Sequence, residues 1–381
     1  MVKDGEFQIS NQEAERLQCL QEVVPNSSES LEVSGTENRS SSLAPEDSTP
    51  SDVPKNVSDC RKVIRKAFTA KGLSVQAAEI MLSSLTESTI KQYANPTKRW
   101  WQFCFKKEYN PYDISESKLL EFLSKRFEEG ASYGTLNSSR SAISLLSNTN
   151  LSDSTLLTRF FKGVYKQRPL RPRYNKTWDP KIVLNYLENL GPIKDLKLSE
   201  LTKKLVALLA LGTGHRLQTL AVIKLVDIKK TKNGLEVEIR ELIKTSKKGV
   251  DQPLLCLPKF EKKPKLCIAT HVEEYIKRTS SIRGNCNNLL VTWSKPHKEA
   301  SSQTISRWIK SVLSASGVGE EFTAYSTRHA STSSAFRKGV DINVIKSTAG
   351  WSKSSEVFAK FYNRPLKQSK NNFAESVILE A

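Results

Sequence analysis

The C-terminal third of the chain contains several side chains that can bind a phosphate group, and one tyrosine follows them. The stretch 323–365 reads TAYSTRHASTSSAFRKGVDINVIKSTAGWSKSSEVFAKFYNRP and includes Arg328, Trp351 and Tyr362. An arginine offers paired donors to phosphate oxygens, an indole offers one donor, and a phenol can donate or accept. Each of these residues alone is more often ordinary core or surface. Their shared order in one strongly basic chain indicates a phosphate-binding site.

Three short helices are expected to position these side chains. The first covers 329–338 and stops at Gly339. Asp341 caps a second helix over 342–349, and a third runs from the following turn to Tyr362. The arginine, the tryptophan and the tyrosine then lie at helix ends, where polar groups can face a ligand.

Two further cations upstream could reach the same ligand. Arg216 follows Gly-Thr-Gly within the apolar helical stretch 205–228. Burying an arginine without a partner is costly, so Arg216 is either in an internal ion pair or half of an anion site. The segment 234–258 alternates apolar and polar residues like a β-hairpin, with Lys244 at the end of its first strand. Taken alone, that lysine is a solvated hairpin charge.

These motifs resemble, in order, those of the tyrosine recombinase (phage integrase) family. They are TGHR with Arg216, IKTSKKG with Lys244, YSTR with Tyr325 and Arg328, GW with Trp351, and FAKFYNR with Tyr362. The resemblance covers about 177–365. Within it, AGWSKSSEVFAKFYNRP looks closest to recombinases of eukaryotic mobile elements of the DIRS, Ngaro and crypton types.

The resemblance implies a chemistry for each residue. Tyr362 attacks a DNA phosphorus and forms a 3′-phosphotyrosyl intermediate, while Arg216 and Arg328 neutralise charge in the transition state. Lys244 protonates the 5′ oxygen that leaves, and Trp351 donates its indole N–H to the phosphate. Because the bond energy is kept in the phosphotyrosine, no metal or other cofactor is implied.

Three features depart from the family pattern. Tyr325 occupies the place where most members have histidine, although a phenol can still donate a hydrogen bond. Thr219 occupies the place where many members carry an acidic residue, so Arg216 must be held in another way. Trp351 and Tyr362 are eleven positions apart, longer than the common spacing by about half a helical turn, which a looser loop must absorb.

The charge of the chain indicates a polyanionic partner. Its 381 residues carry a formal net charge of +19. Residues 1–58 hold eleven acidic and four basic side chains, which leaves +26 on the remaining 323 residues. Because Lys and Arg neutralise backbone phosphates, this charge predicts binding to double-stranded DNA. A basic surface that serves solubility, or binding to acidic membranes, is the alternative.

Compartment and cofactors follow from what the sequence lacks. No apolar run approaches the ~20 residues of a membrane span and no signal-like region follows Met1, so an intracellular, soluble chain is expected. The resemblance to eukaryotic elements implies the nucleus. Six cysteines without a Cys-x-x-Cys pair, and only four histidines, predict reduced thiols and no metal site. The sequence also has no phosphate-binding glycine motif for a nucleotide.

Composition and periodicity divide the chain into five segments. Residues 1–58 are an acidic, Ser-rich leader expected to be disordered, and 59–165 are expected to form a helical core-binding domain. A stiff, basic, Pro-rich linker covers 166–180, and 181–365 form the catalytic domain. The tail 366–381 contains a possible short helix over 373–379. The fold class is mainly α with one small β-sheet, that is, α+β.

The first domain is expected to present basic faces to DNA. Its helices are placed at about 60–81, 88–107, 115–129 and 133–147, with Ile80, Met81, Trp101 and Phe105 among the inward residues and Pro96 at a kink or a helix start. The candidate DNA-binding residues of this domain and the linker are Lys91, Lys98, Arg99, Arg140, Arg171 and Arg173. A helical bundle for protein contacts is the alternative.

The second domain is expected to contain mostly helices. They are placed at 181–190, 201–211, 271–280 and 304–314, the last with Trp308 inward. A short buried strand is placed at 289–292, in addition to the hairpin.

The preferred interpretation is a DNA strand-exchange enzyme of a mobile element, acting as a homotetramer or dimer on DNA. One alternative is a domesticated DNA-binding protein of the same ancestry that no longer cuts, which Tyr325 and Thr219 motivate. Another is a type IB topoisomerase, which uses the same nucleophile as a monomer. A helical scaffold without any DNA role does not account for the basic charge.

Overall fold

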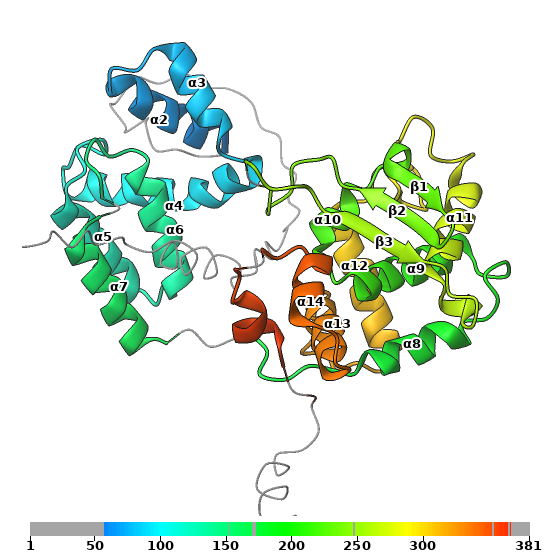
Figure 1. The fold of residues 1–381 in the computed structure, drawn as a ribbon. Coiled ribbons are helices and arrows are strands. Elements are labelled where there is room, and N and C mark those ends of the chain that lie inside the picture. The colour runs from blue at the N-terminus through cyan, green and yellow to red at the C-terminus, as the bar shows by residue number, and fades with distance from the viewer. Residues whose placement is uncertain are drawn as a thin grey trace, which may run out of the picture. The chain divides into compact units, whose positions relative to one another are not determined.

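The computed structural model describes residues 57–151, 153–169, 173–246, 248–352, 354–364 and 366. The chain folds into two compact units, and the boundary between them in the sequence falls between residues 171 and 172 (Figure 1). Expectations for the leader up to residue 56, for Arg171 and for a tail helix at 373–379 concern residues outside these ranges. No helix in the described ranges is long and apolar enough to cross a membrane.

The first unit is entirely helical in its described part. Its helices are α2 (Val57–Ala70), α3 (Val75–Ser83), α4 (Glu87–Lys106), α5 (Glu116–Glu128), α6 (Tyr133–Ser144) and α7 (Thr155–Gln167). A Ser or Thr side chain caps each of the last five by accepting a backbone N–H three residues on, and the caps are Ser74, Thr86, Ser115, Ser132 and Ser154. These hydroxyls satisfy amides that no helical carbonyl can reach, so they fix where the helices begin.

Several residues that the sequence analysis placed in the core of this unit are exposed, because the helices turn other residues inward. Ile80 and Met81 are 67% and 43% exposed, because α3 buries Ala78 and Leu82 instead. Phe105 is 61% exposed, since the inward face of α4 is carried by a different set of residues that includes Trp100, Phe103 and Cys104. The predicted inward residues Ile80, Met81 and Phe105 were therefore wrong. Pro96 lies inside α4 and does not start a helix.

Helix α7 was missed by the sequence analysis. It buries Leu157, Phe161 and Val164, which follow one another at helical spacing. The predicted interdomain linker at 166–180 therefore overlaps the last residues of this helix at Lys166 and Gln167.

The second unit combines helices with one sheet. Its α-helices are α8 (Pro180–Asn189), α9 (Leu198–Thr213), α10 (Leu217–Ala221), α11 (Ile268–Thr279), α12 (Ser302–Ala315), α13 (Ser326–Arg337) and α14 (Ile342–Thr348). Short turns of 3-10 helix, η1 (Leu225–Asp227) and η2 (Pro264–Leu266), precede the sheet's first strand and α11. The strands β1 (Ile228–Thr231), β2 (Gly234–Glu238) and β3 (Leu254–Pro258) form an antiparallel sheet in that order. The α+β fold class is confirmed.

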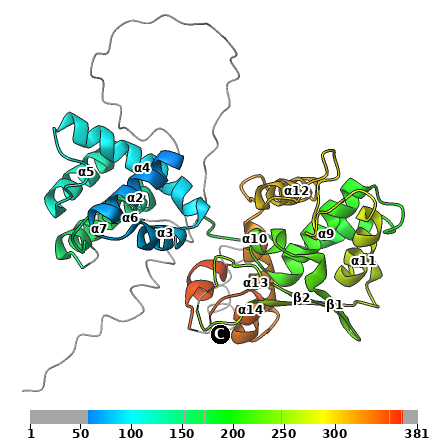
Figure 2. The same cartoon turned by 90° about the horizontal axis from the view of Figure 1, so that it is seen from above.

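Helix α9 lies at the centre of this unit, with α11, α12, α13 and β3 packed against it (Figures 1 and 2). Its side chains are buried on nearly all sides, including Leu201, Leu205 and Leu209 at 0% exposure. An all-round apolar helix is stable only when it is covered on every face. Its C-terminal end is thereby held rigidly beside α13, where the candidate site begins.

Two predicted strands of this unit differ in the structure. Strand β2 ends at Glu238, and the ladder closes where Ile239 N–H donates to the carbonyl of Pro253. Proline has no N–H with which to continue the ladder. Lys244 therefore lies in an exposed turn of the 239–253 connection and not at a strand end. Residues 289–292 contain isolated bridge pairing only, although Leu289, Leu290 and Val291 are buried as predicted.

The third predicted helix before Tyr362 is reduced to one π-helical turn, η3 (Phe358–Tyr362). The serines that follow Trp351 explain this difference. Ser355 Oγ accepts the Val357 N–H at 3.3 Å, which gives the backbone an alternative to helical bonding. The extra spacing between Trp351 and Tyr362 is therefore taken up by an irregular serine-rich segment.

Candidate active site

Arg328 lies in the first turn of α13 and is 2% exposed. Its Nη1 donates to the carbonyl of Gly214 at 2.8 Å and to that of Ala349 at 2.7 Å. These carbonyls belong to the residues that end α9 and α14. The C-terminal carbonyls of a helix lack helical partners and carry partial negative charge, so a guanidinium is a suitable partner. The arginine therefore joins the ends of two helices at the site.

Two glycines make this approach possible. Gly214 has φ +61°, and a Cβ there would lie 3.3 Å from Thr332 Cγ2. Gly350 has φ +72°, and a Cβ there would lie 2.9 Å from the ring of His215. A larger residue would be strained at both positions and would push apart the segments that hold the arginine.

Trp351 and Tyr362 pack directly against this arginine. The Arg328 Cζ lies 3.7 Å from the Trp351 ring centroid and 5.3 Å from the Tyr362 ring centroid. The two rings meet edge to face with their centroids 4.8 Å apart. Both contacts with the guanidinium are within cation–π range. The indole Nε1 is buried and has no hydrogen-bond partner in the described part of the chain, so a ligand oxygen could satisfy it.

The candidate nucleophile, Tyr362, is enclosed by other rings and is only 2% exposed. Its hydroxyl is hydrogen-bonded to the hydroxyl of Tyr325. The His329 ring stacks on it with a centroid distance of 4.2 Å and an interplanar angle of 15°. Ser333 Oγ donates to the Tyr362 carbonyl and accepts the Arg364 N–H at 3.0 Å. Helix α13 thus holds both the ring and the backbone of this tyrosine.

Burial and charge determine the protonation of Tyr325. Burial raises its pKa above the ordinary value, and the adjacent Tyr362 raises it further, whereas Arg328 and Arg216 act in the opposite direction. Tyr325 is therefore a neutral phenol at physiological pH. It can donate a hydrogen bond, which is the capacity expected of it at the position where the family has histidine.

Two histidines belong to the site and were missed by the sequence analysis. His215 is 4% exposed, and burial together with Arg328 and Arg216 lowers its pKa to about 3, against a hydrogen bond with the Thr348 backbone. It is therefore neutral beside the arginines. His329 stacks on Tyr362 as described above. Each histidine is the sequence neighbour of one of the two arginines, and this adjacency was the available signal.

The remaining predicted catalytic residues are placed as follows. Arg216 is half-buried, precedes the first residue of α10, and is close enough to Tyr325 and His215 to act on their pKa values. Thr219 is buried on α10 at 3% exposure and contributes no charge to Arg216. Lys244 is exposed in a turn of the connection between β2 and β3.

The predicted DNA-binding residues have different surroundings. Lys91, Lys98 and Arg99 are exposed on α4, with a spacing of seven or eight residues that places them on one face. Arg140 is half-buried with its guanidinium 5.1 Å from the Phe161 ring centroid, so it contributes to packing within the first unit. Arg173 is exposed beside Tyr174 in the second unit.

Comparison with known proteins shows which family this unit resembles. Residues 184–369 match the Phage integrase family. The matched residues lie in the second unit, which is therefore similar to the phage integrase family over nearly all of its length.

Individual relatives support this assignment. The tyrosine recombinase XerA of Pyrococcus furiosus is 25% identical over 269 residues, covering 68% of this chain and 87% of the relative. The XerH site-specific recombinase in a post-cleavage complex superposes with a TM-score of 0.55 at 16% identity, covering 87% of this chain and 99% of that chain. The pre-cleavage complex of XerH gives a TM-score of 0.51 at 15% identity. The two-unit fold is thus shared with XerH.

Proposed function

We propose that this chain is a tyrosine-type DNA recombinase that cleaves a DNA strand through a covalent 3′-phosphotyrosyl intermediate. The observation that carries the proposal is the contact cluster of Arg328, Trp351, Tyr325 and Tyr362 within a unit that matches the phage integrase family. The test is to trap a covalent adduct between the purified chain and a nicked suicide substrate built from the ends of its own genetic element.

The proposed step forms one bond and breaks another. Tyr362 Oη gives its proton to water and attacks phosphorus while the bond from phosphorus to the 5′ oxygen breaks, and Lys244 donates a separate proton to that oxygen. Arg216 and Arg328 hold the non-bridging oxygens and offset the growing negative charge. Tyr325 donates a hydrogen bond to the reacting oxygens, and the Trp351 indole N–H binds the phosphate. Rejoining reverses the step, so the chemistry requires no nucleotide.

The burial of Tyr362 adds a condition to this proposal. At 2% exposure its hydroxyl cannot reach a DNA phosphate without movement of the 352–364 segment. That segment has only one helical turn and contains several serines. We therefore infer that DNA binding exchanges the hydrogen bond between Tyr325 and Tyr362 for bonds to the phosphate.

The assembly and origin of the enzyme belong to the same proposal. The XerH structures are described as complexes with difH substrate, and this resemblance in fold supports duplex DNA as the substrate here. The resemblance to the recombinase family supports a dimer or tetramer on DNA. The motif around Tyr362 supports a role in a eukaryotic mobile element, and through it location in the nucleus. A non-cutting DNA-binding protein of the same ancestry is the second candidate, because Tyr325 and Thr219 replace family residues.

DNA affinity is predicted to depend strongly on salt. With +26 on the residues after the leader, several phosphates are neutralised in each complex. We expect affinity of residues 59–381 for duplex DNA to fall by about 10³-fold or more between roughly 50 and 200 mM salt, measured by fluorescence anisotropy. Removing the leader should leave affinity equal or higher. A flat response to salt, or loss of binding without the leader, would contradict the DNA-binding proposal.

His329 is predicted to position the nucleophile. Since its ring stacks on Tyr362, His329→Leu should slow single-turnover cleavage by the value of an aromatic pair, about 0.5–1.5 kcal/mol or roughly 2- to 12-fold. The matched variant His329→Phe keeps an aromatic ring at this place and should retain most of the rate. If both variants cleaved at the rate of the unmodified chain, His329 would have no role in positioning Tyr362. If both variants lost the same amount of rate, the ring nitrogens of His329 would be the groups that matter.

A further inference from the structure

Helix α3 of the first unit carries several exposed apolar side chains in addition to its buried ones. It buries Ala78 and Leu82, yet Val75 and Ile80 are each 67% exposed and Met81 is 43% exposed. Gln76, Glu79 and Ser83 are exposed on the same helix, so the apolar side chains make up only part of its outer surface. Large apolar side chains that are exposed together can mark a binding surface, so the part of α3 around Ile80 and Met81 is a candidate surface for another segment.

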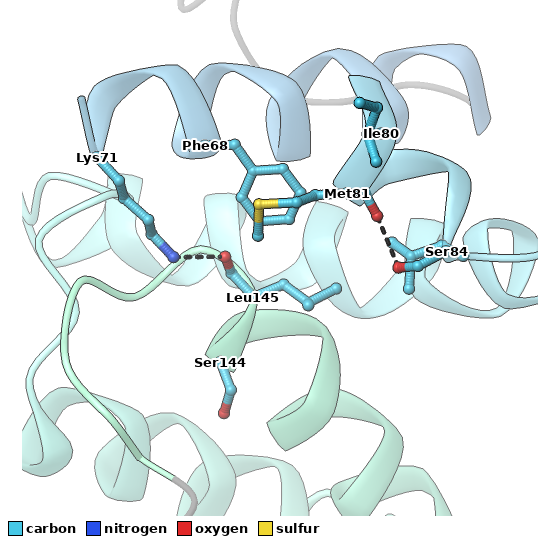
Figure 3. Close-up of a pocket in the computed structure, with 8 residues that line it drawn as sticks. Phe68, Lys71, Ile80, Met81, Ser84, Ser144 and Leu145 are labelled. Carbon is cyan, nitrogen blue, oxygen red and sulfur yellow. Dashed lines mark hydrogen bonds between the residues drawn. The ribbon is translucent and has the colours of Figure 1, made fainter. Parts of the chain in front are cut away.

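The exposed face borders a groove of about 510 Å³ between α2, α3 and the end of α6. Figure 3 shows Phe68 and Met81 in its middle and Lys71 at one end. The lining is mainly apolar, and the Lys71 Nζ donates to the carbonyl of Leu145 at 3.0 Å. The groove thus offers an apolar surface with one cation at its edge, which suits an amphipathic acidic helix.

The leader contains one stretch with this pattern, although most of it lacks a hydrophobic period. Residues 10–25 read SNQEAERLQCLQEVVP, which begins with the Ser-x-x-Glu spacing of a helix start and ends in proline. Its apolar residues at spacings of three and four are Ala14, Leu17, Leu20 and Val24. A helix this short is marginal alone in water, so it would form on docking.

The length of the connecting chain and the charge of the leader favour this leader segment over an unrelated partner as the occupant of the groove. Thirty-three positions separate Val24 from Val57, where α2 begins. A flexible chain of that length spans about 30 Å, which exceeds the roughly 21 Å length of α2. The groove lies at the far end of α2, where Phe68 and Lys71 are located. Residues 1–58 also carry seven more acidic than basic side chains.

We propose that residues 11–24 dock as an amphipathic helix in the groove between α2, α3 and α6, with their apolar face on Ile80 and Met81. A glutamate of the segment then faces Lys71. This docking holds the leader on the first unit. It does not depend on the chemistry proposed for the second unit.

Hydrogen exchange measured by mass spectrometry on the full chain tests the proposal. The variant Leu17→Asp/Leu20→Asp should release the segment and make amides of α3 exchange roughly tenfold faster. Ile80→Asp/Met81→Asp should remove protection of residues 11–24 to a similar extent. Both pairs leave the described core untouched, which circular dichroism checks. The matched control Leu31→Asp changes an apolar leader residue outside the segment and should alter neither region.

Three outcomes would overturn the proposal. The first is that residues 11–24 exchange at the rate of an unprotected peptide in the unmodified chain. The second is that α3 exchanges equally in the Leu17→Asp/Leu20→Asp variant and the unmodified chain. The third is protection of α3 that increases with protein concentration and persists in that variant, which would assign the groove to a second copy of the chain.

Discussion

Tyr362→Phe is expected to abolish covalent capture of DNA while leaving folding and DNA binding intact. The substitution removes one oxygen and keeps the ring that stacks on His329 and meets Trp351. Its cost to stability is limited to the hydrogen bond with Tyr325, about 1–3 kcal/mol if that hydroxyl is left unsatisfied. The measurement is adduct formation on a nicked suicide substrate, resolved by denaturing electrophoresis, beside an affinity measurement on the same DNA.

Tyr325→Phe is the matched control, because it removes the other hydroxyl of the same hydrogen bond. In the unmodified chain the Tyr325 phenol is neutral and serves as a hydrogen-bond donor. Without this donor the Tyr325→Phe variant should react more slowly but still form a detectable adduct. An adduct that survives in Tyr362→Phe and vanishes in Tyr325→Phe would reverse the assignment of the nucleophile. The absence of any adduct from the unmodified chain would favour the non-cutting DNA-binding protein.

The site could be predicted from sequence only where its parts are local. Gly339, Asp341 and Gly350 specify helix ends through backbone conformation and capping, and the structure has α13 and α14 at these places. The stack of His329 on Tyr362 joins residues 33 positions apart. It depends on how α13 packs beside η3, and no local pattern specifies that packing.

Helical periodicity predicted where helices lie better than which side of each is buried. In α3, Ile80 and Met81 are as apolar as the buried Leu82, so the hydrophobic pattern alone does not distinguish two possible inward faces. The choice is made by the partner helix α2, against which α3 packs. The sequence pattern also did not reveal where β2 ends. The alternation of apolar and polar residues continues past Glu238, but the partner strand has no amide N–H at Pro253.

Arg328→Ala is expected to abolish cleavage and also to destabilise the second unit, and it should destabilise that unit more than Arg216→Ala does. Losing a guanidinium from the transition state costs about 2.7–4 kcal/mol, or roughly 10²- to 10³-fold in rate. Arg328 additionally satisfies the carbonyls of Gly214 and Ala349 while 2% exposed. Leaving these buried acceptors without a donor costs about 1–3 kcal/mol each. Arg216 is half-buried beside α10, whereas Arg328 is almost fully buried, so the loss of Arg216 should cost the fold less.

Single-turnover cleavage, DNA affinity and thermal unfolding separate these effects. Both alanine variants should lose far more rate than affinity, and Arg328→Ala should lower the unfolding temperature more than Arg216→Ala, by about 2–4 °C per kcal/mol for a domain of this size. Arg328→Lys should rescue poorly, because one ammonium cannot hold two carbonyls and also present paired donors to a phosphate. If either alanine variant cleaved at close to the unmodified rate, that arginine would have to be assigned to structure only, and the phosphate would need another cation.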